Sequence, residues 1–282
     1  MHNSARRGIV RGTAAALILL SLAGLAAAQG PKFKNIELCN GVDRTSPDIQ
    51  IDACTSLIDS GKQTPQTLVI AYNNRGNAYV AKGEYDRAVQ DYDQSIKLNP
   101  NYSRTFNNRG VAYQKKGEYD LAIKDFDEAI RLNAEYANAF ANRAQTYQHK
   151  SEYERAARDY DEATRLKPTL EAAWSGRCWS RAIVGELQAA LADCNEALRL
   201  EPNAAATFDS RGLIYLKLGE WDSAIADYTS ALRLDPKLAS SLYGRGLAKL
   251  TRGDTSEGNA ELAAAKKLEP NIVEDFIRYG VR

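Results

Sequence analysis

Residues 103–136 read SRTFNNRGVAYQKKGEYDLAIKDFDEAIRLNAEY, and this layout returns every 34 residues through most of the chain. Prolines mark the period most plainly, because five of them lie one or two periods apart, and Ala134 stands where a sixth would fall. Glycines and tyrosines recur at the same interval, as do small and aromatic residues. The clearest positions are Pro100, Pro168, Pro202, Pro236 and Pro270, with Gly76, Gly110, Gly212 and Gly246.

Each copy predicts a pair of antiparallel helices. A first helix of about four turns runs to a glycine near the middle of the repeat, and a second helix runs on to the proline. Proline lacks an amide donor and disfavours helix at the residue before it, so it ends the second helix. Small residues such as Ala122 let the two helices approach closely, and Phe126 fills space between neighbouring repeats. One pair cannot bury its apolar face alone, so the repeats must stack.

The pattern resembles the tetratricopeptide repeat family, whose 34-residue unit carries bulky, small, Tyr, Ala, aromatic, Ala and Pro positions in this order. The resemblance implies an all-α fold, a right-handed superhelical solenoid of antiparallel helix pairs. It also implies a protein or peptide partner, bound in a concave groove that the first helices line. The expected repeats are 69–102, 103–136, 137–170, 171–204, 205–238 and 239–272.

Both ends depart from the pattern, as capping segments do. We expect an N-terminal segment and helical cap at 29–68, in which residues 48–60 form a second helix without a regular first one. At the far end Val273, Phe276 and Ile277 make an apolar stripe. This stripe predicts a capping helix at 273–282 that covers the last repeat.

Residues 1–28 predict a cleaved export signal. Arg6, Arg7 and Arg11 form its basic region, and an apolar run from Thr13 to Ala28 ends in small residues suited to cleavage. The run is shorter than the roughly 20 residues that span a bilayer. We therefore expect a periplasmic or secreted protein with no membrane span after cleavage. An uncleaved anchor is the alternative, and the general and twin-arginine export routes both stay open.

The charge balance argues against nucleic acid as a partner. The chain has 37 basic and 36 acidic residues, and the part after residue 28 has 34 and 36. Neutralising a phosphate backbone needs a clustered excess of basic residues, which this composition lacks.

An arginine occupies the seventh place of every repeat, where the family usually has leucine, and an acid follows 16 residues later each time. A hairpin that turns midway brings the two together. We expect one-to-one ion pairs that hold the helices in register, because such pairing leaves no spare charge for a ligand; a ladder of anion-binding arginines is the alternative. The pairs are Arg75–Asp91, Arg109–Asp125, Arg143–Asp159, Arg177–Asp193, Arg211–Asp227 and Arg245–Glu261.

An asparagine precedes this arginine in three repeats, at Asn74, Asn108 and Asn142. Asparagine is a mediocre helix former, so the column needs a reason. Its amide offers a donor and an acceptor and can pair with a peptide backbone of any sequence. The column resembles the asparagine ladder of O-linked N-acetylglucosamine transferases, which implies peptide binding; solvated or inter-helix hydrogen bonds are the alternative. The later repeats break the column with Gly176, Ser210 and Gly244.

The predicted inner face changes from polar to apolar along the chain. Asn77 and Gln145 belong to its early part, whereas Trp179, Leu213 and Leu247 belong to its late part. We expect all five to contact a bound peptide that has one hydrophobic end. Burial by tight curvature or by the terminal cap is the alternative.

Four cysteines remain after the export signal, and an oxidising compartment favours two disulfides. Cys178 and Cys194 occupy facing small and bulky places of one repeat, so a bond between them is geometrically plausible. Cys39 and Cys54 would then join the N-terminal segment to the cap. Two reduced core cysteines are the alternative for the first pair.

The sequence offers no catalytic motif. No phosphate-binding loop, nucleophile elbow or cluster of metal ligands occurs, and His149 stands alone after the export signal. We therefore expect no enzyme, no metal and no cofactor, but a scaffold or adaptor. A non-catalytic subunit or regulator of a cell-envelope enzyme complex and a structural spacer are the alternatives, and the oligomeric state stays open.

Overall fold

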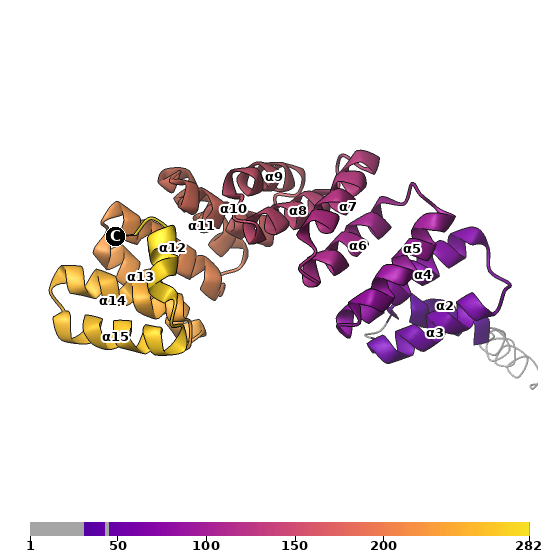
Figure 1. Ribbon diagram of the computed structural model, residues 1–282, viewed down its shortest axis with the longest axis horizontal. Coiled ribbons are helices and arrows are strands. Elements are labelled where there is room, and N and C mark those ends of the chain that lie inside the picture. Colours follow the sequence, from indigo (N-terminus) through magenta and orange to yellow (C-terminus); the bar gives the residue numbers. More distant parts are fainter. Residues whose placement is uncertain (1–30, 43–44, 282) are drawn as a thin grey trace, which may run out of the picture. The chain divides into compact units, whose positions relative to one another are not determined.

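The computed structural model describes residues 31–42 and 45–281, and the expected export signal lies outside them. The described residues form helices and connecting turns, with no strand among them, which confirms the all-α prediction (Figure 1). The helices are α2 Pro31–Cys39, α3 Pro47–Asp59, α4 Pro65–Ala81, α5 Tyr85–Leu98, α6 Ser103–Lys115, α7 Tyr119–Leu132, α8 Ala137–His149, α9 Tyr153–Leu166, α10 Glu171–Val184, α11 Leu187–Leu200, α12 Ala205–Leu218, α13 Trp221–Leu234, α14 Ala239–Arg252, α15 Thr255–Leu268 and α16 Ile272–Arg278.

The chain divides into two compact units, one ending at Pro100 and the other starting at Asn101. The first unit holds α2 to α5, and the second holds α6 to α16. Within each unit consecutive helices pack as antiparallel pairs (Figure 1). The pairs from α4/α5 to α14/α15 each correspond to one expected repeat, although α4 begins four residues early, at Pro65.

The turn inside each repeat requires a left-handed backbone conformation. Gly117 adopts a φ of 78°, and the equivalent glycine in four other repeats is also positive. Ser151 takes this place in the third repeat with a φ of 60°, the one non-glycine residue of positive φ in the described chain. A side chain disfavours that conformation by roughly 1–2 kcal/mol, so packing on both sides of the turn holds Ser151 there.

The second helices end before the periodic proline, as predicted. Helix α5 ends at Leu98, and Asn99 leaves the helix with a φ of −144° and a ψ of 95°. Pro100 favours this extended conformation at the residue before it. Asn133, which precedes Ala134, adopts a φ of −144° and a ψ of 94°. The stacking of repeats therefore imposes the same ending where proline is missing.

The periodic glycine and the periodic aromatic residue fill one space within the first, second and fifth repeats. A Cβ atom on Gly110 would lie 2.7 Å from the Phe126 ring, and one on Gly76 would lie 2.6 Å from the Tyr92 ring. Real Cβ atoms do not approach other atoms so closely, so glycine at these places permits contact between the first helix and the aromatic ring. Phe126 and Tyr92 are almost completely buried.

The N-terminal cap contains one helix more than expected. The helix expected at 48–60 corresponds to α3, which begins after Ser46, whose side chain accepts a hydrogen bond from the Ile49 amide. We expected no regular first helix here, and the helix that packs against α3 is α2, which has nine residues. Helix α2 carries little amphipathic pattern, so its sequence alone did not reveal it. Its place on α3 comes from burial of Cys39 and a disulfide at its C-terminal end.

The C-terminal capping helix, expected at 273–282, spans Ile272–Arg278 in the structure. It packs on α14 and α15 of the last repeat. Ile272 and Phe276 are buried, whereas Ile277 is 60% exposed. Among the described residues, no helix combines the length and the apolar character that crossing a membrane requires.

Candidate functional site

The structure places each periodic arginine against its acid across the helix pair. Arg143 donates from Nε and Nη2 to the two carboxylate oxygens of Asp159, and both distances are 2.7 Å. Such two-point contacts are the strong form of this interaction. The shortest nitrogen–oxygen distances elsewhere are 2.7 Å for Arg75–Asp91, Arg109–Asp125 and Arg211–Asp227, 2.5 Å for Arg177–Asp193 and 2.9 Å for Arg245–Glu261.

The arginines also reach back to the preceding helix pair, which one-to-one pairing did not anticipate. Nη1 of Arg143 donates to Asp127, on the second helix of the previous repeat, at 2.5 Å. Arg211 reaches Asn195 in the same way at 2.6 Å. A guanidinium group presents five donors in a fixed plane, so one side chain can bind two acceptors in different directions. Each of these arginines therefore joins three helices.

Burial and pairing act in opposite directions on these charges. Burial would lower the pKa of Arg143, but the hydrogen bond to Asp159 and its negative charge outweigh this effect and raise it. Burial raises the pKa of Asp159, while Arg143 counteracts the rise. The Arg143 guanidinium also lies 5.6 Å from the centre of the Phe140 ring. These contacts match the structural interpretation of the arginines better than an open anion site.

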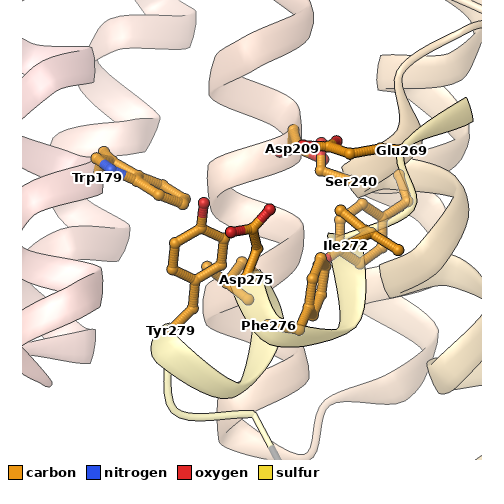
Figure 2. Close-up of a pocket in the computed structure, with 10 residues that line it drawn as sticks. Trp179, Asp209, Ser240, Glu269, Ile272, Asp275, Phe276 and Tyr279 are labelled. Carbon is orange, nitrogen blue, oxygen red and sulfur yellow. The ribbon is translucent and has the colours of Figure 1, made fainter. Parts of the chain in front are cut away.

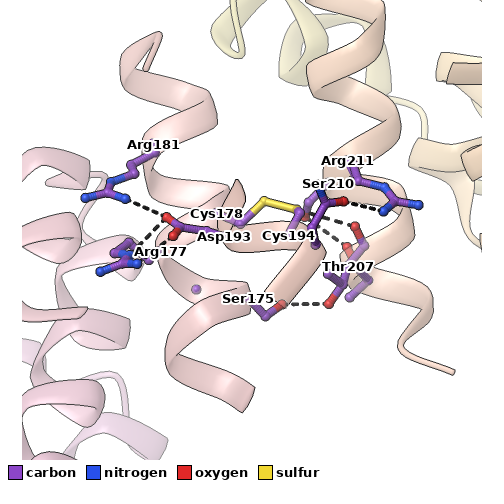
Figure 3. Close-up of a disulfide and its surroundings, with 12 residues drawn as sticks. Ser175, Arg177, Cys178, Arg181, Asp193, Cys194, Thr207, Ser210 and Arg211 are labelled. Atoms are coloured by element: carbon purple, nitrogen blue, oxygen red, sulfur yellow. Dashed lines mark hydrogen bonds and ion pairs between the residues drawn. A yellow bond between two sulfur atoms is a disulfide. The ribbon is translucent and has the colours of Figure 1, made fainter. Parts of the chain in front are cut away.

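The fourth repeat contains the densest charge cluster. Arg177 and Arg181 both donate to Asp193 (Figure 3). Both also donate to Asp161 of the preceding repeat. Arg181 stands where four of the six repeats have tyrosine. Arg181 also pairs with Glu186 at 3.4 Å, so two basic side chains meet three acidic ones and no positive charge is left for a ligand.

Both predicted cysteine pairs lie at bonding distance. Cys178 on α10 bonds to Cys194 on α11, with Cα atoms 5.3 Å apart (Figure 3). Cys39 at the end of α2 bonds to Cys54 on α3, with Cα atoms 4.8 Å apart. The first bond joins the two helices of one repeat, and the second joins the two helices of the N-terminal cap.

The asparagine column makes hydrogen bonds between neighbouring helices. Asn142 donates to the side-chain oxygen of Asn107 at 2.9 Å, and Asn107 donates to Asn108 at 3.1 Å. Asn74 donates to Asn40, in the turn after α2, at 3.1 Å. Part of the column therefore makes the inter-helix contacts of the structural alternative. On the same face Gln145 is exposed, and exposed Asn77 accepts a hydrogen bond from the Tyr92 hydroxyl.

The glycines that break this column have a steric cause. A Cβ atom at Gly176 would lie 2.3 Å from the Tyr160 ring, and one at Gly244 would lie 2.2 Å from the Tyr228 ring. Each tyrosine comes from the second helix of the preceding repeat and extends under the next first helix. In this arrangement glycine is the residue that fits against each ring. The column ends because the packing changes, a reason that a single repeat does not reveal.

The C-terminal segment covers the late inner face. Tyr279 meets Trp179 edge to face, with ring centres 4.9 Å apart, and Phe276 contacts Tyr243 at 4.7 Å. Leu213 is only 3% exposed. Leu247 lines a second cavity together with Val281, near the end of the chain. Burial by the terminal cap, the alternative interpretation of these apolar residues, describes the late inner face.

A cavity of about 200 Å³ lies under α16 (Figure 2). Trp179 and Tyr279 stand on one side of it, and Asp209, Ser240 and Glu269 stand on the other. Asp209 is not among the site residues predicted from the sequence. The sequence does distinguish Asp209, because it is the only acid at the fifth place of the six repeats. The other five repeats have Asn73, Asn107, Ala141, Ser175 and Tyr243 at this place.

The helix pairs and the stacking between them define a helical-repeat protein. Family models described as tetratricopeptide repeat match residues 103–136 and 137–170, and a model described as TPR repeat matches 76–117 and 212–253. The first two ranges coincide with repeats expected from the period. The chain belongs to the tetratricopeptide repeat family. Its repeats indicate a protein–protein interaction scaffold, and this fold is generally non-catalytic.

Solved structures show the same fold at low sequence identity. PilF of Pseudomonas aeruginosa is 18% identical, with a TM-score of 0.65 over 76% of this chain and 99% of that chain. A tetratricopeptide repeat protein of Parabacteroides merdae is 17% identical, with a TM-score of 0.62 over 89% and 100%. YrrB, titled a TPR protein with an unusual peptide-binding site, is 18% identical, with a TM-score of 0.55 over 68% and 96%. No curated protein matches the sequence.

Proposed function

We propose that this protein is an exported scaffold that holds an extended segment of a partner protein on the polar inner face of α6 and α8. The observation that carries the proposal is the contrast between inner surfaces within the second unit. Gln145, Asn138 and Arg104 are exposed on α6 and α8, whereas the inner face of α10, α12 and α14 is covered by the chain's own α16. An entering segment therefore meets amide and guanidinium groups first.

The chemistry of this surface suits a peptide backbone. Asn142 uses its amide nitrogen on Asn107, and it lies three residues before the exposed Gln145 on α8, so both residues are on one side of the helix. Side-chain amides can accept from backbone N–H groups and donate to backbone carbonyls, so they hold an extended chain of varied sequence. In the first unit, Asn74 and Asn77 present the same chemistry on α4. YrrB, which shares the fold alone, is described as having a peptide-binding site.

Export is part of the proposal. Two disulfides among the described residues are typical of proteins that fold in an oxidising compartment, and thiols stay reduced in most cytosols. We therefore propose a periplasmic or secreted location, with residues 1–28 as the export signal.

The test replaces the amides and measures binding and stability separately. Asn108→Ala, Asn142→Ala and Gln145→Ala are combined in one variant, and partners are captured from cell-envelope extract at matched bait concentration. Partners identified with the wild-type protein should bind the variant at least tenfold more weakly. Loss of the hydrogen bonds that Asn142 and Asn108 make with buried Asn107 should cost about 1–3 kcal/mol, so binding is compared at a temperature at which circular dichroism shows that both proteins are folded.

A matched control removes three exposed amides from other surfaces, through Gln90→Ala, Gln188→Ala and Asn203→Ala. This control should bind as the wild type does. Equal binding by the inner-face variant, with the same partners and affinities, would show that this surface is not the binding site.

A further inference from the structure

The cavity under α16 contains an acid with no cationic partner. Among the described residues, no lysine or arginine forms an ion pair with Asp209. Its hydrogen-bond partners are hydroxyls, with Ser241 donating to it at 2.5 Å and Ser240 as the second. Burial raises the pKa of Asp209 to about 6, although both hydroxyls act in the opposite direction. Each buried acid of the arginine pairs, such as Asp227, accepts hydrogen bonds from a guanidinium group, whereas Asp209 has no positively charged partner.

The same cavity is lined by a tyrosine whose hydroxyl has no partner. Tyr228 is completely buried, and its hydroxyl makes no hydrogen bond. Its counterparts are satisfied by inner-face amides, since Tyr92 donates to Asn77 at 2.7 Å and Tyr160 donates to Gln148 at 3.2 Å. The places of those amides are taken by leucines in the fifth repeat, at Leu213 and Leu216. A buried hydroxyl without a partner destabilises the folded protein, and a ligand that bonds to the Tyr228 hydroxyl would remove this cost.

The walls of the cavity favour an organic cation over a metal ion. Trp179, Phe276 and Tyr279 supply aromatic faces and edges, and Leu213 and Ile272 supply aliphatic surface. Aromatic faces attract ammonium groups, and the attraction increases when water is excluded. In the part of the chain that the structure describes, no three acidic, histidine or cysteine side chains gather closely enough to hold a metal ion. Of the two further acids at the cavity, Asp275 already pairs with Arg278, and Glu269 is exposed.

We infer that this cavity binds a primary alkylammonium group, from a free amine or from a lysine side chain of a partner. The ammonium donates to the Asp209 carboxylate and to the Tyr228 hydroxyl, and its alkyl stem packs on Leu213, Ile272 and Phe276. An engineered cavity of about 150 Å³ holds benzene, so the volume of about 200 Å³ accommodates a four-carbon amine. This site lies on different helices from the polar surface of α6 and α8, and it does not depend on that proposal.

Because α16 supplies Ile272, Asp275 and Phe276, and Tyr279 follows directly after it, the cavity exists only while this helix is docked. An occupant therefore stabilises the docked state of the C-terminal segment by binding it and not the undocked state. Amine binding is thus coupled to the docking of α16 on the inner face of α10, α12 and α14.

The test is isothermal titration of the full-length chain with n-butylammonium chloride, with 1-butanol as the uncharged probe of similar size. The wild type should bind the ammonium and not the alcohol. Asp209→Asn should weaken ammonium binding at least tenfold, and Tyr228→Phe should weaken it severalfold, since a charge-assisted hydrogen bond contributes more than a neutral one. Asp222→Asn, which removes an exposed acid of α13, should bind as the wild type does.

Two further measurements test the site: the pH dependence of ammonium binding and its competition with inorganic cations. Asp209 faces Tyr228 of α13, Ser240 of α14, Glu269, Asp275 of α16, and Tyr279. Wild-type affinity should fall severalfold between pH 8 and pH 5 as the Asp209 carboxylate gains a proton, and Asp209→Asn should lose most of this difference. Titration with Nα-acetyl-lysine methylamide and with n-butylammonium distinguishes a lysine side chain of a partner from a free amine. Binding of either compound supports the site, and the compound that binds more tightly identifies the source of the ammonium group.

Equal binding of butanol and butylammonium would overturn the inference, as would wild-type affinity in a folded Asp209→Asn variant. Displacement of the amine by sodium or calcium chloride at equal ionic strength, beyond the effect of a tetramethylammonium salt, would also overturn it in favour of an inorganic cation.

Discussion

The inner faces of α8 and α12 belong to the same repeated fold, yet they meet different surroundings. On α8, Gln145 is exposed and Asn142 bonds to a neighbouring first helix. On α12, Leu213 occupies the place of Gln145, and α16 covers it. A change of a few side chains within the repeated helix pair therefore decides whether the inner surface stays open or is covered by the C-terminal segment of the same chain.

The largest effect should come from removing the main contact of the cover. Phe276→Ala deletes a buried ring that packs on Tyr243, and such deletions cost about 3–5 kcal/mol. Hydrogen exchange should show lost protection in α12, α14 and α16, with α6 and α8 unchanged, because a repeat contacts only its neighbours. Ile277→Ala, on the exposed side of the same helix, is the control and should have almost no effect. Uniform loss of protection across the second unit would show that the two faces are not independent.

The disulfides should have the next largest effect. Each closes a loop of about 15 residues, for which the chain-entropy estimate is about 3 kcal/mol. Reduction should lower the stability of the fourth repeat through Cys178–Cys194 and that of the N-terminal cap through Cys39–Cys54. Intact-mass analysis with an alkylating agent on protein from its native compartment should find no free thiol. Alkylation of all four cysteines would show that neither disulfide forms, and it would weaken the case for export.

A double-mutant cycle on the polar side tests the arginine pairs. Arg143→Leu should destabilise the protein by up to about 3 kcal/mol because it leaves Asp159 buried without its partner. Combining it with Asp159→Leu should recover much of the loss, while Asp127, which also contacts Arg143, limits full recovery. Chemical denaturation of the single and double variants measures the coupling. Coupling near zero would favour the alternative of arginines that serve a ligand.

The smallest effect should be a stabilisation on the covered side. The folded-state pKa of Asp209 is raised to about 6, so the folded protein holds this proton more tightly than the unfolded chain does. The contribution of Asp209 to stability is therefore present at low pH and is lost as the pH rises through about 6. Asp209→Asn should then stabilise the protein by about 2 kcal/mol at pH 8 and by much less at pH 4. Thermal unfolding at both values checks this, with Asp222→Asn as a control that should show no such difference.

The repeats and their ion pairs could be predicted because their causes are local. Arg143 and Asp159 are 16 residues apart, and a helix pair with its turn midway brings them together whatever surrounds it. The same reasoning located the pairing of Cys178 with Cys194 inside one repeat. Contacts between repeats were harder to predict. Three features depend on a neighbour that the period does not specify. They are the hydrogen bond from Arg143 to Asp127, the contact between the Tyr160 ring and Gly176, and helix α2.

By itself the sequence determined the 34-residue helix pair, its turn and ending, and the partners within each repeat, because these depend on residues close along the chain. Only the tertiary structure decided which inner surface is open. Helix α16 carries an apolar stripe that could have packed on several faces of the last repeat, and its burial against Trp179 and Tyr243 selects one. That docking joins Asp209, Tyr228 and Phe276, which lie up to 67 residues apart, into one cavity. Packing between distant residues creates such a site, and no local sequence pattern predicts it.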